Sequence, residues 1–222
     1  MSQKLDITIP GFTIIAGICG SGKTSAIEYI LYKNKKKFDY GLIFTNTFFT
    51  DNSFSYIPNQ YVHGEFSEEK LSNFMDIQSN LVKQGVKKNA FLVLDDCLDD
   101  PGMWNSSVFK RLISQFRHYN ITIIITTQYP QAIPARFRSG AFQILIFQNT
   151  TERAIRGLFE SFGQLFNLYN EFKNFVNQST VNYQFIFINN KCPENSIEKK
   201  YQVMRINNKF PKNWKLEFNT NI

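Results

Sequence analysis

The chain has 222 residues, 43% of them hydrophobic, which is enough for one sizeable α/β domain with a buried core. Its net charge of +7 favours an anionic partner such as nucleic acid, although an ordinary solvated surface explains such a charge about as often. The three cysteines have no CxxC spacing, which argues against a zinc site or a disulfide framework and favours a reducing compartment. Residues 1–10 carry charges and no apolar run reaches the length of a membrane span, so we expect neither a signal peptide nor a transmembrane segment.

The first predicted elements surround a glycine-rich motif. Residues 12–16, Phe-Thr-Ile-Ile-Ala, are typical of a buried strand, and residues 25–33 of a helix. Between them, residues 17–24 read Gly-Ile-Cys-Gly-Ser-Gly-Lys-Thr and match the nucleotide-binding P-loop, GxxxxGK[ST], at every fixed position. A chance glycine-rich turn is the alternative, and the strand and helix on either side disfavour it. The sequence therefore predicts a nucleoside triphosphate site.

Each residue type in this motif has a chemical reason. Glycines let the backbone turn tightly enough to point N–H groups at phosphate oxygens, and the following helix presents its positive N-terminus to the same anion. Lys23 is expected to reach the β- and γ-phosphates, and the Thr24 hydroxyl to ligate Mg²⁺. The residues predicted to bind ATP are Gly17, Gly20, Ser21, Gly22, Lys23, Thr24 and Ser25.

The rest of the chain alternates between strand-like and helix-like segments, which predicts an α/β fold with a mainly parallel sheet. Residues 183–188 and 201–206 read as a hairpin, so an antiparallel edge is expected late in the chain. We expect a single domain over residues 1–222, with its core at about 12–150 and a C-terminal helix and hairpin at 151–222. The other expected strands are 5–9, 41–45, 60–63, 91–95, 121–126 and 142–147, and helices are expected between Ser67 and Gly85 and at about 106–119 and 151–176.

A pair of acidic residues supplies the second candidate element. The apolar residues 91–94 deliver Asp95 and Asp96 at the carboxyl end of a strand. Ligands of open α/β sheets bind at that edge, where the P-loop also lies. Asp95 is then placed to hold Mg²⁺, usually through its water shell, and Asp96 to orient or deprotonate the attacking water. An acidic turn is the alternative, and Asp96 is shorter than the Glu that many P-loop ATPases carry there.

The third element is Gln128, which follows the apolar strand 121–127. An amide at the end of a buried strand next to the P-loop can touch the γ-phosphate or the attacking water. We therefore expect Gln128 to sense whether the γ-phosphate is present. Taken alone, Gln128 is better interpreted as a plain loop residue.

The order of these elements carries a resemblance to a known superfamily. The chain has a P-loop, then a strand ending in Asp-Asp, then a helix, then a strand followed by Gln. This order, together with the stretches 115–130 and 133–138, looks like that of the FtsK/HerA superfamily of DNA-pumping ATPases. Within it, the run Arg117-His118-x-x-Ile121 and the Asp-Asp ending are most similar to the poxvirus-type genome-packaging ATPases of large eukaryotic DNA viruses and virophages. The resemblance covers about residues 12–147, and more weakly the region of Arg153 and the closing hairpin.

The resemblance implies a RecA-like P-loop NTPase fold and Mg²⁺-dependent ATP hydrolysis that moves double-stranded DNA into a viral capsid. It also implies a homo-oligomeric ring, a pentamer or hexamer, in which one subunit donates an arginine to the ATP of its neighbour. Arg117 is our first choice for this arginine, and the other candidates are Arg136, Arg138 and Arg153. A capsid or portal-vertex protein is a further implied partner, and the virion or the host cytoplasm, at the viral factory, is the expected location.

Two segments have open interpretations. Lys35, Lys36 and Lys37 are candidates for contact with DNA phosphates, although a solvated loop is the simpler interpretation. The region 47–59 is unusually rich in aromatic residues, which serve either as subunit contacts or as a DNA-gripping loop. These aromatic residues are Phe48, Phe49, Phe54 and Tyr56.

Other functions remain open at this stage. A cellular or plasmid-type DNA translocase or helicase of the same superfamily is the nearest alternative. A small-molecule kinase needs an arginine-rich lid, and a GTPase needs Asn-Lys-x-Asp, which residues 34–37 do not provide. A protein that binds ATP only as an assembly switch, without turnover, also fits, because Asp replaces Glu at position 96.

Overall fold

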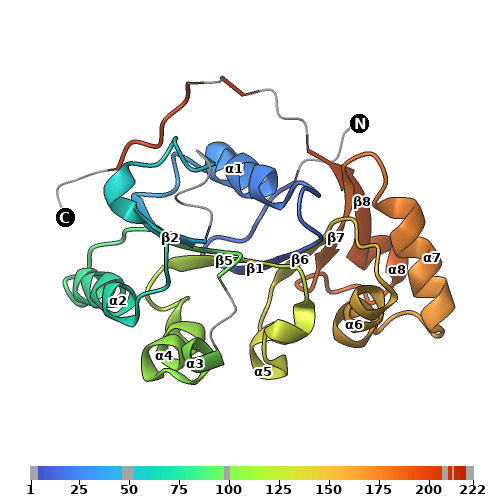
Figure 1. Ribbon diagram of the computed structural model, residues 1–222. Coiled ribbons are helices and arrows are strands. Elements are labelled where there is room, and N and C mark those ends of the chain that lie inside the picture. The colour runs from blue at the N-terminus through green and yellow to red at the C-terminus, as the bar shows by residue number, and fades with distance from the viewer. Residues whose placement is uncertain (1–4, 47–52, 98–100, 207–209, 212, 219–222) are drawn as a thin grey trace.

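A computed structural model describes the fold of residues 5–46, 53–97, 101–206, 210–211 and 213–218. Within these residues, eight strands form one sheet in the order β3-β2-β4-β5-β1-β6-β7-β8 (Figure 1). The strands are β1 (Phe12–Ala16), β2 (Tyr40–Thr45), β3 (Val62–His63), β4 (Ala90–Asp95), β5 (Ile121–Thr127), β6 (Gln143–Ile146), β7 (Gln184–Asn189) and β8 (Tyr201–Arg205).

The direction of the strands gives the sheet two different edges. Strands β1 to β6 pair in parallel, whereas β7 and β8 pair antiparallel on one side. We call the edge where β1, β2, β4, β5 and β6 end the carboxyl edge, and the edge where they begin the amino edge. The predicted parallel sheet with a late antiparallel hairpin is therefore confirmed.

Helices cover both faces of the sheet. Helix α1 lies on one face, and α2 to α6 lie on the other (Figure 1). Three of them begin at a side chain that accepts a hydrogen bond from a free backbone N–H group: Ser67 before α2, Ser106 before α4 and Thr151 before α6. The helices are α1 (Lys23–Lys33), α2 (Glu68–Lys83), α3 (Pro101–Asn105), α4 (Ser107–Gln115), α5 (Ala135–Arg138), α6 (Glu152–Phe162), α7 (Tyr169–Ser179) and α8 (Ile197–Lys200), with 3₁₀ turns η1 (Asn59–Tyr61) and η2 (Pro130–Ala132).

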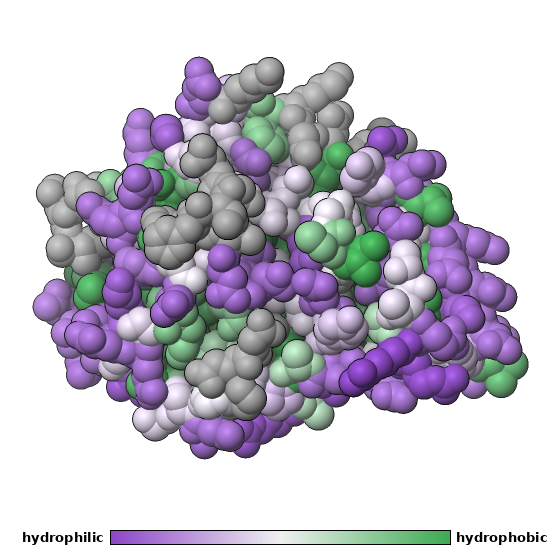
Figure 2. Space-filling model, viewed as in Figure 1, coloured by the Kyte–Doolittle hydropathy of each residue, from purple (hydrophilic) through white to green (hydrophobic). Residues whose placement is uncertain are grey.

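The core has two layers because alternate strand residues point to opposite faces. Phe12 and Ile14 of β1 pack toward α2 to α6, whereas Ile15 packs toward α1. Every residue of β1, β2, β4, β5 and β6 is buried, as expected for parallel strands covered on both faces. On the face drawn in Figure 2, hydrophobic residues form small separate patches among hydrophilic ones. None of the helices in the described residues combines the length and the apolar content needed to cross a bilayer.

Three of the expected elements differ from the structure. Of the strand expected at 60–63, only β3 (62–63) forms, because residues 59–61 make the 3₁₀ turn η1. Residues 5–9 form no strand. The Thr8 N–H donates to Gln143 Oε1 at 3.4 Å, and Gln143 Nε2 donates to Thr8 Oγ1 at 2.7 Å. The helix expected at 151–176 is two helices, α6 and α7, separated by residues 163–168. Gly163 ends α6, where an added Cβ would meet the Phe159 carbonyl oxygen at 2.7 Å.

The C-terminal segment 213–218 covers the loop after β2. The Trp214 ring stacks on Tyr56 with centroids 4.4 Å apart, and its Nε1 donates to Glu28 Oε1 of α1 at 2.9 Å. Leu216 N also donates to the Tyr56 carbonyl at 2.8 Å. Phe54 and Tyr56 are therefore core residues of their own chain, whereas Phe48 and Phe49 lie outside the described residues.

Replacing Gly41 of β2 tests how tightly β2 packs against Phe91 of β4. A Cβ at Gly41 would lie 2.3 Å from the ring of Phe91, which is completely buried, so Gly41→Ala forces the core apart. We expect the free energy of unfolding to fall by about 1–3 kcal/mol in denaturant titrations. Gly140→Ala is the matched control, because its Cβ would approach only the Phe137 carbonyl oxygen, at 3.4 Å. Equal stability of the two variants would contradict this account.

Candidate active site

The glycine-rich turn lies at the carboxyl edge between two neighbouring strand ends. Gly17 N donates to the Thr127 carbonyl at the end of β5, and Ile18 N donates to the Gln148 carbonyl after β6, both at 3.0 Å. Gly20 and Gly22 have φ angles of +73° and +107°, which side chains rarely tolerate. The turn therefore leads directly from β1 into the N-terminus of α1, as the sequence predicted.

Close packing explains why the first position of the turn is also glycine. A Cβ at Gly17 would lie 2.6 Å from Ser21 Oγ and 2.7 Å from the Phe147 Cβ. Ser21 Oγ itself is buried and has no hydrogen-bond partner within the described part of the chain. Such an unsatisfied hydroxyl in a glycine-rich turn fits a loop that binds the oxygens of a phosphate group.

Lys23, the first residue of α1, turns its ammonium back onto this loop. Its side chain is 8% exposed, and Nζ donates to the carbonyl oxygens of Gly17 at 2.9 Å and Ile18 at 3.0 Å. The carbonyl groups satisfy a buried charge that would otherwise be costly. A cation is thereby held within the loop and at the positive end of a helix, where an anion is most stabilised.

Asp95, the last residue of β4, is a buried carboxylate held by two threonines. Thr126 Oγ1 of β5 donates to Asp95 Oδ1 at 2.8 Å, and Thr45 Oγ1 of β2 donates to Asp95 Oδ2 at 3.3 Å. Burial raises the pKa of the Asp95 carboxyl, and the Thr126 hydroxyl opposes this by stabilising the charged form. The two flanking strands therefore fix the position of the carboxylate.

Asp96 follows in a left-handed backbone conformation, with φ of +53°. Its N–H donates to Thr126 Oγ1 at 2.9 Å, and its carbonyl accepts from Asn46 Nδ2 at 2.8 Å. Gln128 Nε2 lies 3.3 and 3.5 Å from the two carboxylate oxygens of Asp96. The structure thus brings Asp95, Asp96 and Gln128 together beside the P-loop strand.

Arg117 lies at the other edge of the sheet. It follows α4 and precedes β5, is exposed, and places its guanidinium 6.0 Å from the centre of the Phe142 ring. Strand β5 spans seven residues, so roughly 20 Å separates the amino edge from the carboxyl edge. Arg117 therefore cannot join the P-loop of its own chain.

The other arginines named from the sequence differ in how firmly they are held. Arg136 donates to the Trp104 carbonyl at 3.1 Å, and Arg138 donates to the carbonyls of Pro130 and Ile133. Arg153 is exposed on the first turn of α6, at the carboxyl edge. It lines a cavity together with Tyr129, the residue that follows Gln128.

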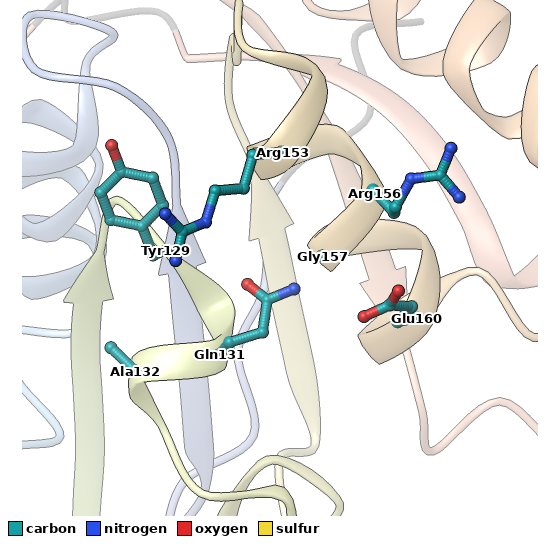
Figure 3. Close-up of a pocket in the computed structure, with 7 residues that line it drawn as sticks. All are labelled: Tyr129, Gln131, Ala132, Arg153, Arg156, Gly157 and Glu160. Atoms are coloured by element: carbon teal, nitrogen blue, oxygen red, sulfur yellow. The ribbon is translucent and has the colours of Figure 1, made fainter.

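A cavity of about 650 Å³ lies between α6 and the segment that follows Gln128. Figure 3 shows Tyr129 and Arg153 side by side at one end of it, and Gln131 pointing toward Gly157. Gln131 occupies the space that a side chain at position 157 would fill. The lining carries two arginines, Arg153 and Arg156, and one acid, Glu160. The segment after Gln128 is therefore packed directly on α6.

Sequence reasoning did not identify Thr45, Asn46 and Thr126, the residues that hold the two acids. The threonines at the ends of β2 and β5 were the available signal, because polar residues in otherwise apolar strands need a partner when buried. Which partner they take depends on the order of strands in the sheet, and a single sequence does not reveal that order.

The residues present fit a hydrated magnesium ion. Mg²⁺ takes oxygen ligands, keeps several waters and usually binds one or two protein groups together with nucleotide phosphates. Thr24 supplies a hydroxyl and Asp95 a carboxylate at the same sheet edge. The described residues contain no cluster of three or more His, Cys, Asp or Glu side chains that could hold a metal on their own.

Comparison with known proteins places the chain in a viral group. A family model described as "Poxvirus A32 protein" matches residues 10–161. Protein 075L of Invertebrate iridescent virus 6 is 25% identical over 185 residues, which cover 82% of this chain and 71% of that protein. The resemblance inferred from the sequence is confirmed by these matches.

Solved structures show the same fold. The genome packaging NTPase B204 of Sulfolobus turreted icosahedral virus 2, in complex with AMPPCP, superposes with a TM-score of 0.64 at 15% identity, covering 89% of this chain and 99% of that one. The conjugation coupling protein TcpA of pCW3, with ATPγS, gives a TM-score of 0.55 at 13% identity, covering 89% and 60%. The predicted P-loop NTPase fold is therefore confirmed.

Substituting Thr126 tests how the acids are held. Thr126→Val removes the donor to Asp95 and the acceptor for the Asp96 N–H, so we expect ATP turnover to fall at least tenfold and stability to fall by about 1–3 kcal/mol. Thr126→Ser keeps the hydroxyl and should restore most of both. Steady-state turnover and denaturant unfolding measure the two effects.

Thr122 supplies the matched control on the same strand. Its Oγ1 is buried and has no hydrogen-bond partner in the described residues, so Thr122→Val should leave turnover unchanged and stability equal or higher. If Thr122→Val and Thr126→Val had the same effect, the hydroxyl of Thr126 would have no special role.

Proposed function

This chain belongs to the poxvirus A32 protein family, and we propose that it is a Mg²⁺-dependent ATPase that moves double-stranded DNA into a viral capsid. The observation that carries the proposal is the meeting of three strand ends at the P-loop. Strand β4 brings Asp95 and Asp96, β5 brings Gln128, and β1 leads into the loop that holds Lys23. These are the groups that phosphoryl transfer to water requires.

Each group has a distinct role in hydrolysis. The loop N–H groups and Lys23 bind the phosphates, and Thr24 and Asp95 hold Mg²⁺, which neutralises charge on the phosphate oxygens. The Asp96 carboxylate orients or deprotonates the attacking water. Gln128, whose amide already faces Asp96, contacts the same water or the γ-phosphate. The backbone from Gln128 through η2 then carries the change to α6, on which it is packed.

We assign the trans arginine to Arg117. It is exposed and lies at the edge opposite the P-loop, so a head-to-tail arrangement of copies would bring the Arg117 loop of one against the carboxyl edge of the next. Head-to-tail contacts close into a ring when the rotation between copies permits it. In line with the resemblance, we propose a homo-oligomeric ring of five or six copies around DNA, acting in the virion or host cytoplasm with a capsid or portal-vertex partner.

One observation favours a second function, an ATP-bound assembly switch without turnover. The contacts between Gln128 and Asp96 are long for hydrogen bonds, and Asp reaches less far than Glu. A site in which the base is held too far from the water would bind ATP without hydrolysing it. Turnover that depends on assembly and on DNA separates the motor from this switch and from a kinase.

ATP hydrolysis across a protein-concentration series, with and without linear double-stranded DNA, tests the proposal. We expect turnover per chain to rise with concentration and with DNA, and to be abolished in Lys23→Ala and Asp96→Asn. Asp96→Asn should still bind ATP, because it keeps the shape of the side chain and removes only the base. Tight ATP binding with no turnover at any concentration would instead support the switch.

Mixing two inactive variants tests the arginine. Arg117→Ala should lower turnover about 10³-fold, the usual size of an arginine finger effect. In a mixture with Lys23→Ala, some interfaces join an intact Lys23 to an intact Arg117 from the neighbour, so activity should reappear. The same mixing with Arg153→Ala is the comparison, and recovery only with Arg153→Ala would move the role to α6.

A further inference from the structure

Two neighbouring loops at the amino edge gather exposed lysines. The loop 34–39 leads from α1 into β2, and the loop 84–89 leads from α2 into β4. They are joined by a hydrogen bond from Asp39 N to the Asn89 carbonyl at 2.9 Å, and β2 and β4 then pair from their first residues. The lysine corner consists of the exposed residues of these loops and the helix ends before them: Lys33, Lys35, Lys36, Lys37, Lys83 and Lys87.

The positive charge of this corner is not neutralised by nearby acids. Its acid, Asp39, is already paired with Lys88 at 3.0 Å and accepts from the Asn89 N–H at 2.8 Å. The other ion pairs within the described residues lie elsewhere and involve none of the six lysines. Lys33 and Lys35 lie over the rings of Tyr29 and Tyr32, which leaves their ammonium groups toward solvent.

Helix ends explain only part of this pattern. Lys33 and Lys83 are in the last turns of α1 and α2, where a cation stabilises the negative end of the helix dipole. Lys35, Lys36, Lys37 and Lys87 lie beyond those turns. Helices α1 and α2 are on opposite faces of the sheet, so only the edge itself brings their lysines together (Figure 1).

We propose that the lysine corner binds the phosphodiester backbone of double-stranded DNA without reading its sequence. The inference rests on the proposed function and names the surface of this chain that would contact the DNA. Duplex DNA carries one negative charge per about 1.7 Å of its axis, so several lysines on two adjacent loops can each meet a phosphate. Lysine is a point charge and lacks the planar fork that reads guanine, which fits backbone contact. ATP binding at the carboxyl edge remains unobstructed.

A charge-matched pair of variants tests the corner. In the first, Lys36, Lys37 and Lys87 are replaced by Gln, which keeps the Lys33 and Lys35 contacts on tyrosine. In the second, Lys110, Lys173 and Lys199 are replaced by Gln, which removes the same charge from α4, α7 and α8. Binding of a fluorescent 30-base-pair duplex is measured across a salt series with a non-hydrolysable ATP analogue present, and ATP turnover is measured without DNA.

The proposal predicts that only the first variant binds DNA more weakly. Its dissociation constant should rise at least about tenfold at low salt, and the slope of log K against log[salt] should become shallower by about 3, one unit for each phosphate that a lysine no longer neutralises. Its ATP turnover without DNA should equal that of the unmodified chain. The second variant should match the unmodified chain in both measurements.

Four other results would overturn the inference. Equal weakening in both variants would show that only total charge matters. Unchanged DNA binding with lower turnover in the first variant would make the corner a contact between subunits. If the unmodified chain bound no duplex at all, the DNA part of the proposed function would fail too, whereas equal binding by all three proteins would reject the corner alone.

Discussion

The burial of the Asp95 carboxylate is the constraint on which the site depends. A charge at the end of a covered strand is tolerated only where neighbouring groups donate hydrogen bonds to it. Here Thr45, the last residue of β2, and Thr126, the second-to-last residue of β5, do so. The Thr126 hydroxyl also accepts from the Asp96 N–H, so one side chain positions both acids. The hydrogen bond that Asp95 needs when buried therefore also fixes the backbone of Asp96, and the Asp96 carboxylate faces Gln128.

The parallel sheet separates two kinds of chemistry. Every parallel strand ends at the carboxyl edge, so acids, amide and glycine loop converge there, while the returning loops collect lysines and Arg117 at the amino edge. A subunit built this way has unlike ends. Unlike ends can associate head to tail, whereas a two-fold dimer pairs each surface with its own copy.

Much of this could be predicted from the sequence because it depends on local patterns. The glycine motif, the apolar strands and the acids at a strand end each follow from neighbouring residues, and the rule that parallel strands share an edge brought Asp95, Asp96 and Gln128 together. The rest depends on contacts distant in sequence. Thr126 meets Asp95 only because β4 and β5 are adjacent, and Tyr56 is covered by a residue far along the chain. Residues 5–9 have the alternating burial of a strand but no strand to pair with.

The stacking of Trp214 on Tyr56 has a consequence for how the chain is made. The helix that follows the glycine loop is bonded through Glu28 to a residue 186 positions later. During synthesis the first half of the sheet can form early, but the layer over α1 is completed only after residues 213–218 have left the ribosome. Until then the ring of Tyr56 lacks its cover. The packing around α1 is therefore one of the last parts of the fold to be completed in a nascent chain.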